Sequence, residues 1–189
     1  LLNLHNFEFV DVELNDIKGG SLRAYIRNRN ADPNRFADAT YRELALERLQ
    51  SLREQEVRLG LDDIEVYREF AVWVNRIKED VVGFIKEQVA RGKTVYVYGA
   101  STKGNTLLQY FGLDRTLITA AAERNPDKWG KVTVGTHIPI VSEEEARAAK
   151  PDYFLVLPWH FLEEFRLREK AYLLSGGKFI VPMPNFTLI

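Results

Sequence analysis

The chain has 189 residues, 46% of them hydrophobic and 28% charged, with a formal net charge of −1, which suits one domain or one domain with a substantial appendage. The near-neutral charge gives no electrostatic attraction to nucleic acid or an anionic membrane, and no apolar run approaches the roughly 18 residues that span a bilayer, so we expect a cytoplasmic protein that binds neither. The absence of cysteine excludes a disulfide scaffold, a thiolate zinc site and a cysteine nucleophile.

The first predicted element is a β-hairpin. Residues 7–14 alternate apolar and acidic side chains, with a slip near Val10, and residues 21–27 alternate again. A period of two is typical of strands. Two strands alone are marginal in water, so we expect this hairpin to join a larger sheet. Since the chain opens on Leu1 inside an apolar pattern, we expect a piece of a longer polypeptide, with residues 1–30 as the tail of a domain that lies mostly outside it.

Two helices are predicted after the hairpin, beyond a cluster of turn residues at 30–34. Residues 40–59 carry apolar side chains at helical spacing among many Glu and Arg residues. Asp62 and Glu65 form a variant of the capping box, which predicts the start of a second helix of about 28 residues. A helix of that length can brace two domains. We therefore predict a helical connector over residues 31–92.

From residue 93 onward, short strands rich in β-branched and aromatic residues alternate with helical segments. The strands are apolar on both faces, which is typical of a parallel sheet covered by helices on both sides. We therefore predict an α/β fold for residues 93–189, a Rossmann-like, doubly wound and mainly parallel sheet of strand order 3-2-1-4-5. The acidic runs at 143–145 and 163–164 are expected on solvated helix faces. The predicted strands are TVYVYG from Thr94, LITAAAE from Leu117, HIPIV from His137, DYFLVLP from Asp152 and KFIVPMP from Lys178.

The turn YGASTKGN after the first of these strands is the candidate ligand loop, because doubly wound sheets bind ligands where the strand order reverses. Glycine lets the backbone approach a ligand, and a helix N-terminus favours an anion. The G-x-G-x-x-G motif fails at Ser101, and G-x-x-x-x-G-K-[ST] fails at Asn105, so a tight structural turn remains an alternative. The candidate residues are Gly99, Ser101, Thr102, Lys103, Gly104 and Asn105.

Further candidates follow two other strands. Glu123 ends the second strand, where dinucleotide folds place a carboxylate on a ribose hydroxyl, and Asn125 follows in a polar turn that equally fits a solvated loop. Trp159 and His160 follow the fourth strand. A histidine there can donate to a phosphate or titrate near neutral pH, although a packed ring is the alternative. The other histidines show no metal-ligand spacing, and we predict no metal site and no catalytic residue.

Longer stretches of the sequence resemble a known family. YGASTKGNTLLQY from Tyr98, AERNPDKWGK from Ala122, IPIVSEEEARAAKPDYFLVLPWHF and SGGKFIVPMP are similar to the C-terminal domain of S-adenosylmethionine-dependent sugar C-methyltransferases, and GGSLRAYIR from Gly19 resembles the segment before it. The resemblance implies a three-part design: a zinc-binding segment with cysteines, a central methyltransferase domain that binds S-adenosylmethionine, and a Rossmann-like domain associated with the nucleotide-sugar substrate.

The sequence departs from that whole design, since it has no cysteines, no methyltransferase cofactor loop and no counterpart of the catalytic segment. The resemblance therefore implies that S-adenosylmethionine binds outside this chain and that the fragment alone transfers no methyl group. The implied partners are a nucleoside diphosphate sugar and a methyltransferase domain of the same polypeptide. Two alternatives remain: a purely structural or oligomerisation domain, and an NAD-binding oxidoreductase fragment, which Glu123 favours and the failed glycine motif disfavours.

Overall fold

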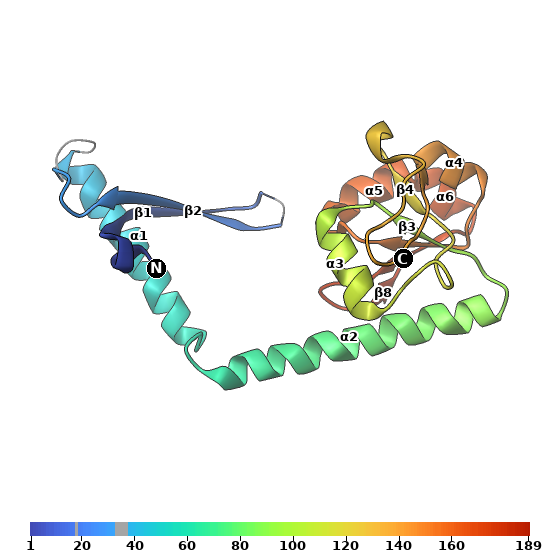
Figure 1. Cartoon of the computed structure of the whole chain (residues 1–189), viewed down its shortest axis with the longest axis horizontal. Helices are drawn as coiled ribbons and strands as arrows, with labels where there is room; N and C mark the ends of the chain where they lie inside the picture. Colours follow the sequence, from blue (N-terminus) through green and yellow to red (C-terminus); the bar gives the residue numbers. More distant parts are fainter. Residues whose placement is uncertain (18, 33–37) are drawn as a thin grey trace. The chain divides into compact units, whose positions relative to one another are not determined.

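The computed structural model describes residues 1–17, 19–32 and 38–189, which form two compact units, Leu1–Phe70 and Ala71–Ile189 (Figure 1). Of the predicted turn at 30–34, residues 33 and 34 lie outside the described part. Within the described ranges, no helix is both long enough and apolar enough to cross a membrane.

The first unit contains the predicted hairpin. A short 3-10 helix, η1 (Leu2–His5), precedes strand β1 (Phe7–Asn15), which pairs antiparallel with β2 (Ser21–Asn28). The register shifts between Phe9 and Asp11, so the slip expected near Val10 is confirmed as an irregularity in β1. In the described residues this sheet has two strands only.

Two helices follow, close to their predicted limits. Helix α1 (Ala39–Arg58) is capped by Asp38, and helix α2 (Ile64–Ala90) has 27 residues. The predicted cap of α2 was wrong by one position, because Asp63 rather than Asp62 accepts the hydrogen bond from the amide of Glu65, at 2.9 Å. A turn closed by the amide of Asp63 on the carbonyl oxygen of Gly60, at 2.8 Å, places Asp62 before the helix start.

The carboxylate of Asp11 attaches α1 to the hairpin. It is fully buried and accepts two hydrogen bonds from the guanidinium of Arg48, at 2.8 and 2.7 Å, and one from the hydroxyl of Tyr41, at 2.5 Å. These hydrogen bonds to the charged form outweigh the effect of burial and lower the pKa of Asp11 to about 2. The hairpin and α1 are therefore joined by a charged contact as well as by apolar packing.

The second unit is built on a six-stranded sheet in the order β5-β4-β3-β6-β7-β8. All neighbouring pairs are parallel except β7 and β8. Counted from β3, the parallel strands lie in the order 3-2-1-4-5, and β8, which was not predicted, adds one antiparallel edge. The prediction of a mainly parallel α/β sheet is confirmed. The strands are β3 (Val95–Tyr98), β4 (Ala121–Glu123), β5 (Ile140–Ser142), β6 (Tyr153–Val156), β7 (Lys178–Val181) and β8 (Thr187–Leu188).

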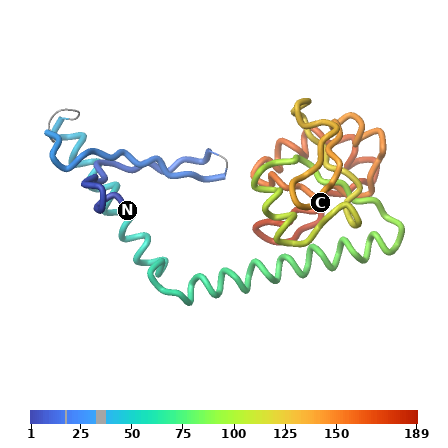
Figure 2. Tube along the Cα trace, in the orientation of Figure 1, coloured from blue at the N-terminus to red at the C-terminus, as the bar shows by residue number. Residues whose placement is uncertain are grey.

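Helices cover both faces of this sheet. Figure 2 shows the path of the chain through the strands and helices. On one face, Val95 and Val97 of β3 pack in a cluster with residues of α2 and of α3 (Thr102–Phe111). On the other face, Tyr98 packs with residues of α4 (Glu143–Ala148) and α5 (Leu162–Arg168). Because successive side chains of a strand point to opposite faces, burial on both sides explains the nearly continuous apolar strands.

All five predicted strands are shorter in the structure, and the helix predicted after β6 is broken. The strand expected from Leu117 begins at Ala121, because the amides of Leu117 and Ile118 close a turn on Asp114. The strand expected from His137 begins at Ile140, because His137 has a left-handed φ of 53°. The single helix expected over 161–174 is a 3-10 turn, η3 (Trp159–Phe161), followed by α5 and α6 (Lys170–Leu174), with Glu169 at the break.

Candidate functional site

The candidate site lies at the carboxyl ends of β3, β4 and β6. These strands are neighbours in the sheet, with β3 between the other two, so the segments that follow them meet at one edge. All ten residues predicted from the sequence lie on these segments or at the start of α3. From β3 the chain passes through α3 to β4 and then to β5 on one side of β3, and it returns from β5 through α4 to β6 on the other side, so the strand order reverses at this edge.

The two glycines of the first turn are required by packing. Gly99 has a φ of 87°, and a Cβ there would lie 2.6 Å from Cγ of Pro158. A Cβ on Gly104 would lie 2.6 Å from two side-chain carbons of Leu157. Such distances do not occur for real Cβ atoms, so any larger residue would push α3 away from the segment after β6. Close packing therefore accounts for both glycines without a ligand.

Ser101 begins helix α3. Its hydroxyl oxygen accepts a hydrogen bond from the amide of Gly104 at 3.0 Å, which satisfies one of the amides that an α-helix leaves without an internal partner. Thr102 and Lys103 follow on the first turn and are exposed. The hydroxyl oxygen of Ser101 thus has a structural role, while the next two side chains face solvent beside the helix N-terminus.

His160 lies in η3 after β6, and Lys103 lies in the first turn of α3 after β3. Burial lowers the pKa of His160, and the positive charge of Lys103 lowers it further, so the imidazole is neutral at neutral pH. The ring of His160 lies 4.3 Å from that of Phe161 and 6.3 Å from that of Trp159, between centroids. Trp159 itself packs partly against the core on the α4 and α5 face. A cation at the start of α3 and a neutral imidazole in η3 therefore lie at the same edge of the sheet.

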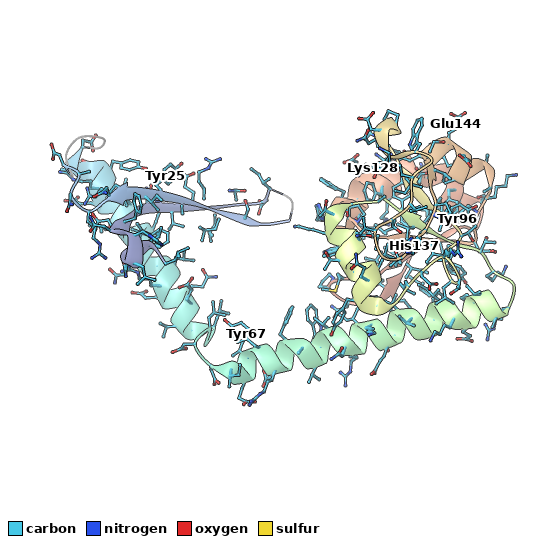
Figure 3. All side chains as sticks on the ribbon, in the orientation of Figure 1. Tyr25, Tyr67, Tyr96, Lys128, His137 and Glu144 are labelled. Atoms are coloured by element: carbon cyan, nitrogen blue, oxygen red, sulfur yellow. The ribbon has the colours of Figure 1, made fainter. Side chains whose placement is uncertain are left out.

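Lys128 is a site residue that the sequence reasoning did not select (Figure 3). Its ammonium group donates to the carbonyl oxygen of Ala100 and to the carboxylate of Glu123, both at 3.0 Å. The other carboxylate oxygen of Glu123 accepts from the amide of Asn125 at 3.0 Å. Because both oxygens have partners inside the loops, binding of a ribose by Glu123 would require an exchange of hydrogen bonds.

The loop after β4 is further fixed by its own contacts. The side-chain oxygen of Asn125 accepts from the amide of Asp127 at 3.0 Å and caps the 3-10 helix η2 (Pro126–Lys128). The indole nitrogen of Trp129 donates to the carbonyl oxygen of Glu123 at 2.8 Å. Asn125 therefore uses its acceptor locally, as a cap.

Asn105 carries an unsatisfied group. Among the described residues, its Oδ1 atom is buried and has no hydrogen-bond partner. Most buried side-chain oxygens in folded proteins are hydrogen-bonded. The amide oxygen of Asn105 can therefore accept a hydrogen bond from a water molecule or a ligand hydroxyl.

A buried polar cluster supports the end of β3. The hydroxyl of Tyr98 donates to Glu169 at 2.6 Å and accepts from Arg168 at 3.0 and 2.9 Å. Arg147 of α4 holds Glu169 through hydrogen bonds of 2.6 to 3.0 Å. Burial alone would raise the pKa of Glu169, but Arg147 and Tyr98 outweigh it and lower this pKa. The carboxylate at the helix break is therefore ionised and joins α4, α5 and β3.

Two comparisons with known proteins point to the same kind of protein. Residues 16–184 match the sequence profile of a family described as "C-methyltransferase C-terminal domain". The chain is similar to the C-methyltransferase NovU of Streptomyces niveus, with 37% identity over 185 residues. The similarity covers 98% of this chain and 42% of NovU, so the chain spans less than half the length of this relative.

Proposed function

We propose a function from one premise, that the chain belongs to the C-methyltransferase C-terminal domain family. Residues 93–189 form the substrate-side domain of an S-adenosylmethionine-dependent methyltransferase, and the carboxyl edge of their sheet binds a nucleoside diphosphate sugar. The strand order supports a Rossmann-like classification of this domain. The observation that carries the proposal is the position of Lys103 at the start of α3 and of His160 in η3, both at the edge where the strand order reverses.

The side chains at this edge suit a polar, anionic ligand. Lys103 and the N-terminus of α3 favour the negative charge of a diphosphate. A neutral His160 offers one N–H donor and one acceptor, and Asn105 Oδ1 accepts from a ribose or sugar hydroxyl. Thr102 adds an exposed hydroxyl. Gly99, Gly104, Ser101, Glu123 and Asn125 shape the loops, and Trp159 forms the rim beside His160.

The described residues do not fit S-adenosylmethionine at the first turn. The space beside Gly99 and Gly104 is filled by Pro158 and Leu157, and the carboxylate of Glu123 is already paired with Lys128. We therefore assign the cofactor and the methyl transfer to a part of the polypeptide outside this chain. In this assignment residues 1–30 are the tail of the methyltransferase domain and residues 31–92 are the connector.

Isothermal titration calorimetry tests the binding proposal. Titration of the folded chain with dTDP and UDP, and with their glucose conjugates, is expected to show weak binding. Lys103→Ala is expected to weaken it about tenfold, as the loss of a charge-assisted contact does. Lys150→Ala, which removes an exposed lysine beyond the other end of the sheet, is the matched control. An absence of heat with all four ligands, on folded protein, contradicts the proposal.

The packing of the two glycines favours a second candidate, a purely structural or oligomerisation domain, since Gly99 and Gly104 are explained without a ligand. If this candidate is right, Lys103→Ala changes the assembly state measured by analytical sedimentation, and neither the variant nor the unchanged chain binds the nucleotides. The NAD-binding alternative is weakened by the pairing of Glu123 with Lys128, because the carboxylate that would hold a ribose hydroxyl is already occupied.

A further inference from the structure

The hairpin has one apolar face. The cross-strand register places Phe9 opposite Ile26, Val12 opposite Ala24 and Leu14 opposite Leu22, and paired residues of a sheet point to the same face. Val12 is buried, but the side chains around it are exposed. We call these four side chains the apolar hairpin face: Phe9, Leu14, Leu22 and Ile26, which are 45%, 63%, 49% and 48% exposed.

The opposite face of the hairpin is closed by its own polar pairs. Arg27 contacts Glu8 at 2.7 Å, and Arg23 contacts Glu13 at 3.2 Å. The hydroxyl of Tyr25 also donates to Glu13, at 3.0 Å. These pairs satisfy charged groups across the two strands. One face of the hairpin is thus complete within the described residues, while the other leaves large apolar side chains in water.

The first unit covers this face only in part, since Phe9 and Ile26 line a cavity together with Ala45 and Leu46 of α1. Helix α1 covers the middle of β1, and the buried hydrophobic residues in the described part of the unit are Val12, Ala45 and Leu49. Most residues of β2 are exposed. A two-stranded sheet needs a further strand or helix on its apolar face for stability, and a contiguous exposed apolar surface marks an interaction site. The apolar hairpin face therefore requires a partner.

The comparisons indicate which partner that is. The match to the family of C-terminal domains begins at residue 16, after the end of β1 and before β2. More than half of NovU lies outside the region matched by this chain, whereas the hairpin lies within it. Strand β1 thus lies before the region that the profile of the C-terminal domain family matches. A stable interface between separate molecules uses roughly 20 to 30 residues on each side, far more than these four side chains. A partner in the same polypeptide needs less surface, because the covalent connection gives it a high effective concentration.

We infer that the apolar hairpin face packs against the methyltransferase part of the same polypeptide. The inference rests on the proposed function, because it requires that part to exist. Its occupant is an apolar surface of the methyltransferase domain, covalently connected to the hairpin, rather than a second copy of this chain. Packing there buries Leu14 and Leu22, and it completes the small core that the first unit begins with Val12, Ala45 and Leu49.

Hydrogen exchange tests this inference in the full-length enzyme, with the chain of residues 1–189 for comparison. The amides of residues 21–28 are expected to exchange at least about tenfold more slowly in the full-length enzyme, since docking raises the free energy of local opening. Leu22→Asp in the full-length enzyme is expected to restore fast exchange. Arg23→Gln, on the polar face of the same strand, is the matched control and should leave the protection in place. Leu22→Ala provides a milder change if the aspartate variant does not fold.

Two results would overturn the inference. Equal exchange in the two proteins would show that the methyltransferase part does not cover the hairpin. If the amides of residues 21–28 are protected in the chain of residues 1–189 alone, and this protection increases with protein concentration, the occupant is a second copy of the chain. Neither result depends on nucleotide binding, so failure of the docking inference is distinguishable from failure of the proposed ligand site, which calorimetry reports.

Discussion

Lys128 donates a 3.0 Å hydrogen bond to the carbonyl oxygen of Ala100, so the loop after β4 is tied to the turn after β3. The same ammonium group neutralises Glu123. Both loops flank the candidate site, and a change at Lys128 therefore alters the geometry of the edge without touching the core of the sheet.

We predict that Lys128→Met lowers the free energy of unfolding by about 1 kcal/mol or less, because the lysine side chain is partly exposed and such pairs contribute little. Nucleotide affinity is expected to fall as well, since the first turn loses its tie. Thermal unfolding and calorimetry measure the two effects. Lys131→Met, in the same loop, serves as control, and an identical loss in both variants would show that Lys128 has no specific role.

Gly99→Ala is predicted to destabilise the second unit by about 3 kcal/mol, the sum of a strained backbone and an overpacked contact. The φ of 87° and the Pro158 side chain both oppose a Cβ there. Gly112→Ala separates the two effects, because Gly112 has a φ of 69° and a Cβ added there would meet nothing within 4 Å. Urea unfolding compares the variants. Equal midpoints for the two would mean that contact with Pro158 does not restrict this turn.

The Asp11 carboxylate gives the first unit a predictable acid response. Its folded pKa of about 2 lies below the ordinary value of 3.8, so its contribution to stability is present above pH 4 and is lost as the pH falls toward 2. Carbon NMR of the carboxyl group measures this pKa directly. In Arg48→Met the pKa of Asp11 should rise, because burial remains while the guanidinium that donates two hydrogen bonds to the carboxylate is gone. An unchanged pKa of Asp11 in that variant would mean that the hydrogen bonds from Arg48 do not lower it.

Glu169→Leu is predicted to cost about 1 to 3 kcal/mol, because it leaves the buried Tyr98 hydroxyl and the partly exposed Arg147 without their carboxylate partner. Glu169 is 2% exposed and holds Arg147. Glu164→Leu, which removes an exposed partner of Arg168 at 3.1 Å, should change stability by less than about 1 kcal/mol. Chemical denaturation separates the two cases. A similar small loss in both variants would mean that the buried cluster does not hold the sheet and helices together.

Much of the fold follows from periodicity in the sequence. The hairpin, its irregularity near Val10 and the parallel strands were predicted, because alternation and apolar runs report which faces are buried. Strand β8 was not predicted, since two residues are too few to show a pattern. The acidic run at 143–145 was predicted on a solvated face, but the Glu143 side chain is only 14% exposed and pairs with Arg147 and Arg168. Such pairing depends on side chains that are distant in the sequence.

The residues predicted as a site do lie at one edge of the sheet, whereas their function as a site stays a prediction and their contacts were not predictable. A glycine in a turn indicates close approach, and only the structure shows that Pro158 and Leu157, rather than a ligand, approach Gly99 and Gly104. The contact of Lys128 with Ala100 could not be predicted for a related reason. It depends on which carbonyl oxygen the folded loop places within reach of the ammonium group.

The most direct test of the central claim is amide chemical-shift mapping of the isotope-labelled chain during titration with dTDP-glucose and UDP-glucose. The proposed function predicts shifts in residues 99–105 and 159–161, at the start of α3 and after β6, with smaller shifts in the loop of Lys128. Absence of shifts at saturating ligand, or shifts confined to other surfaces of the folded chain, would contradict a nucleotide-sugar site at this edge.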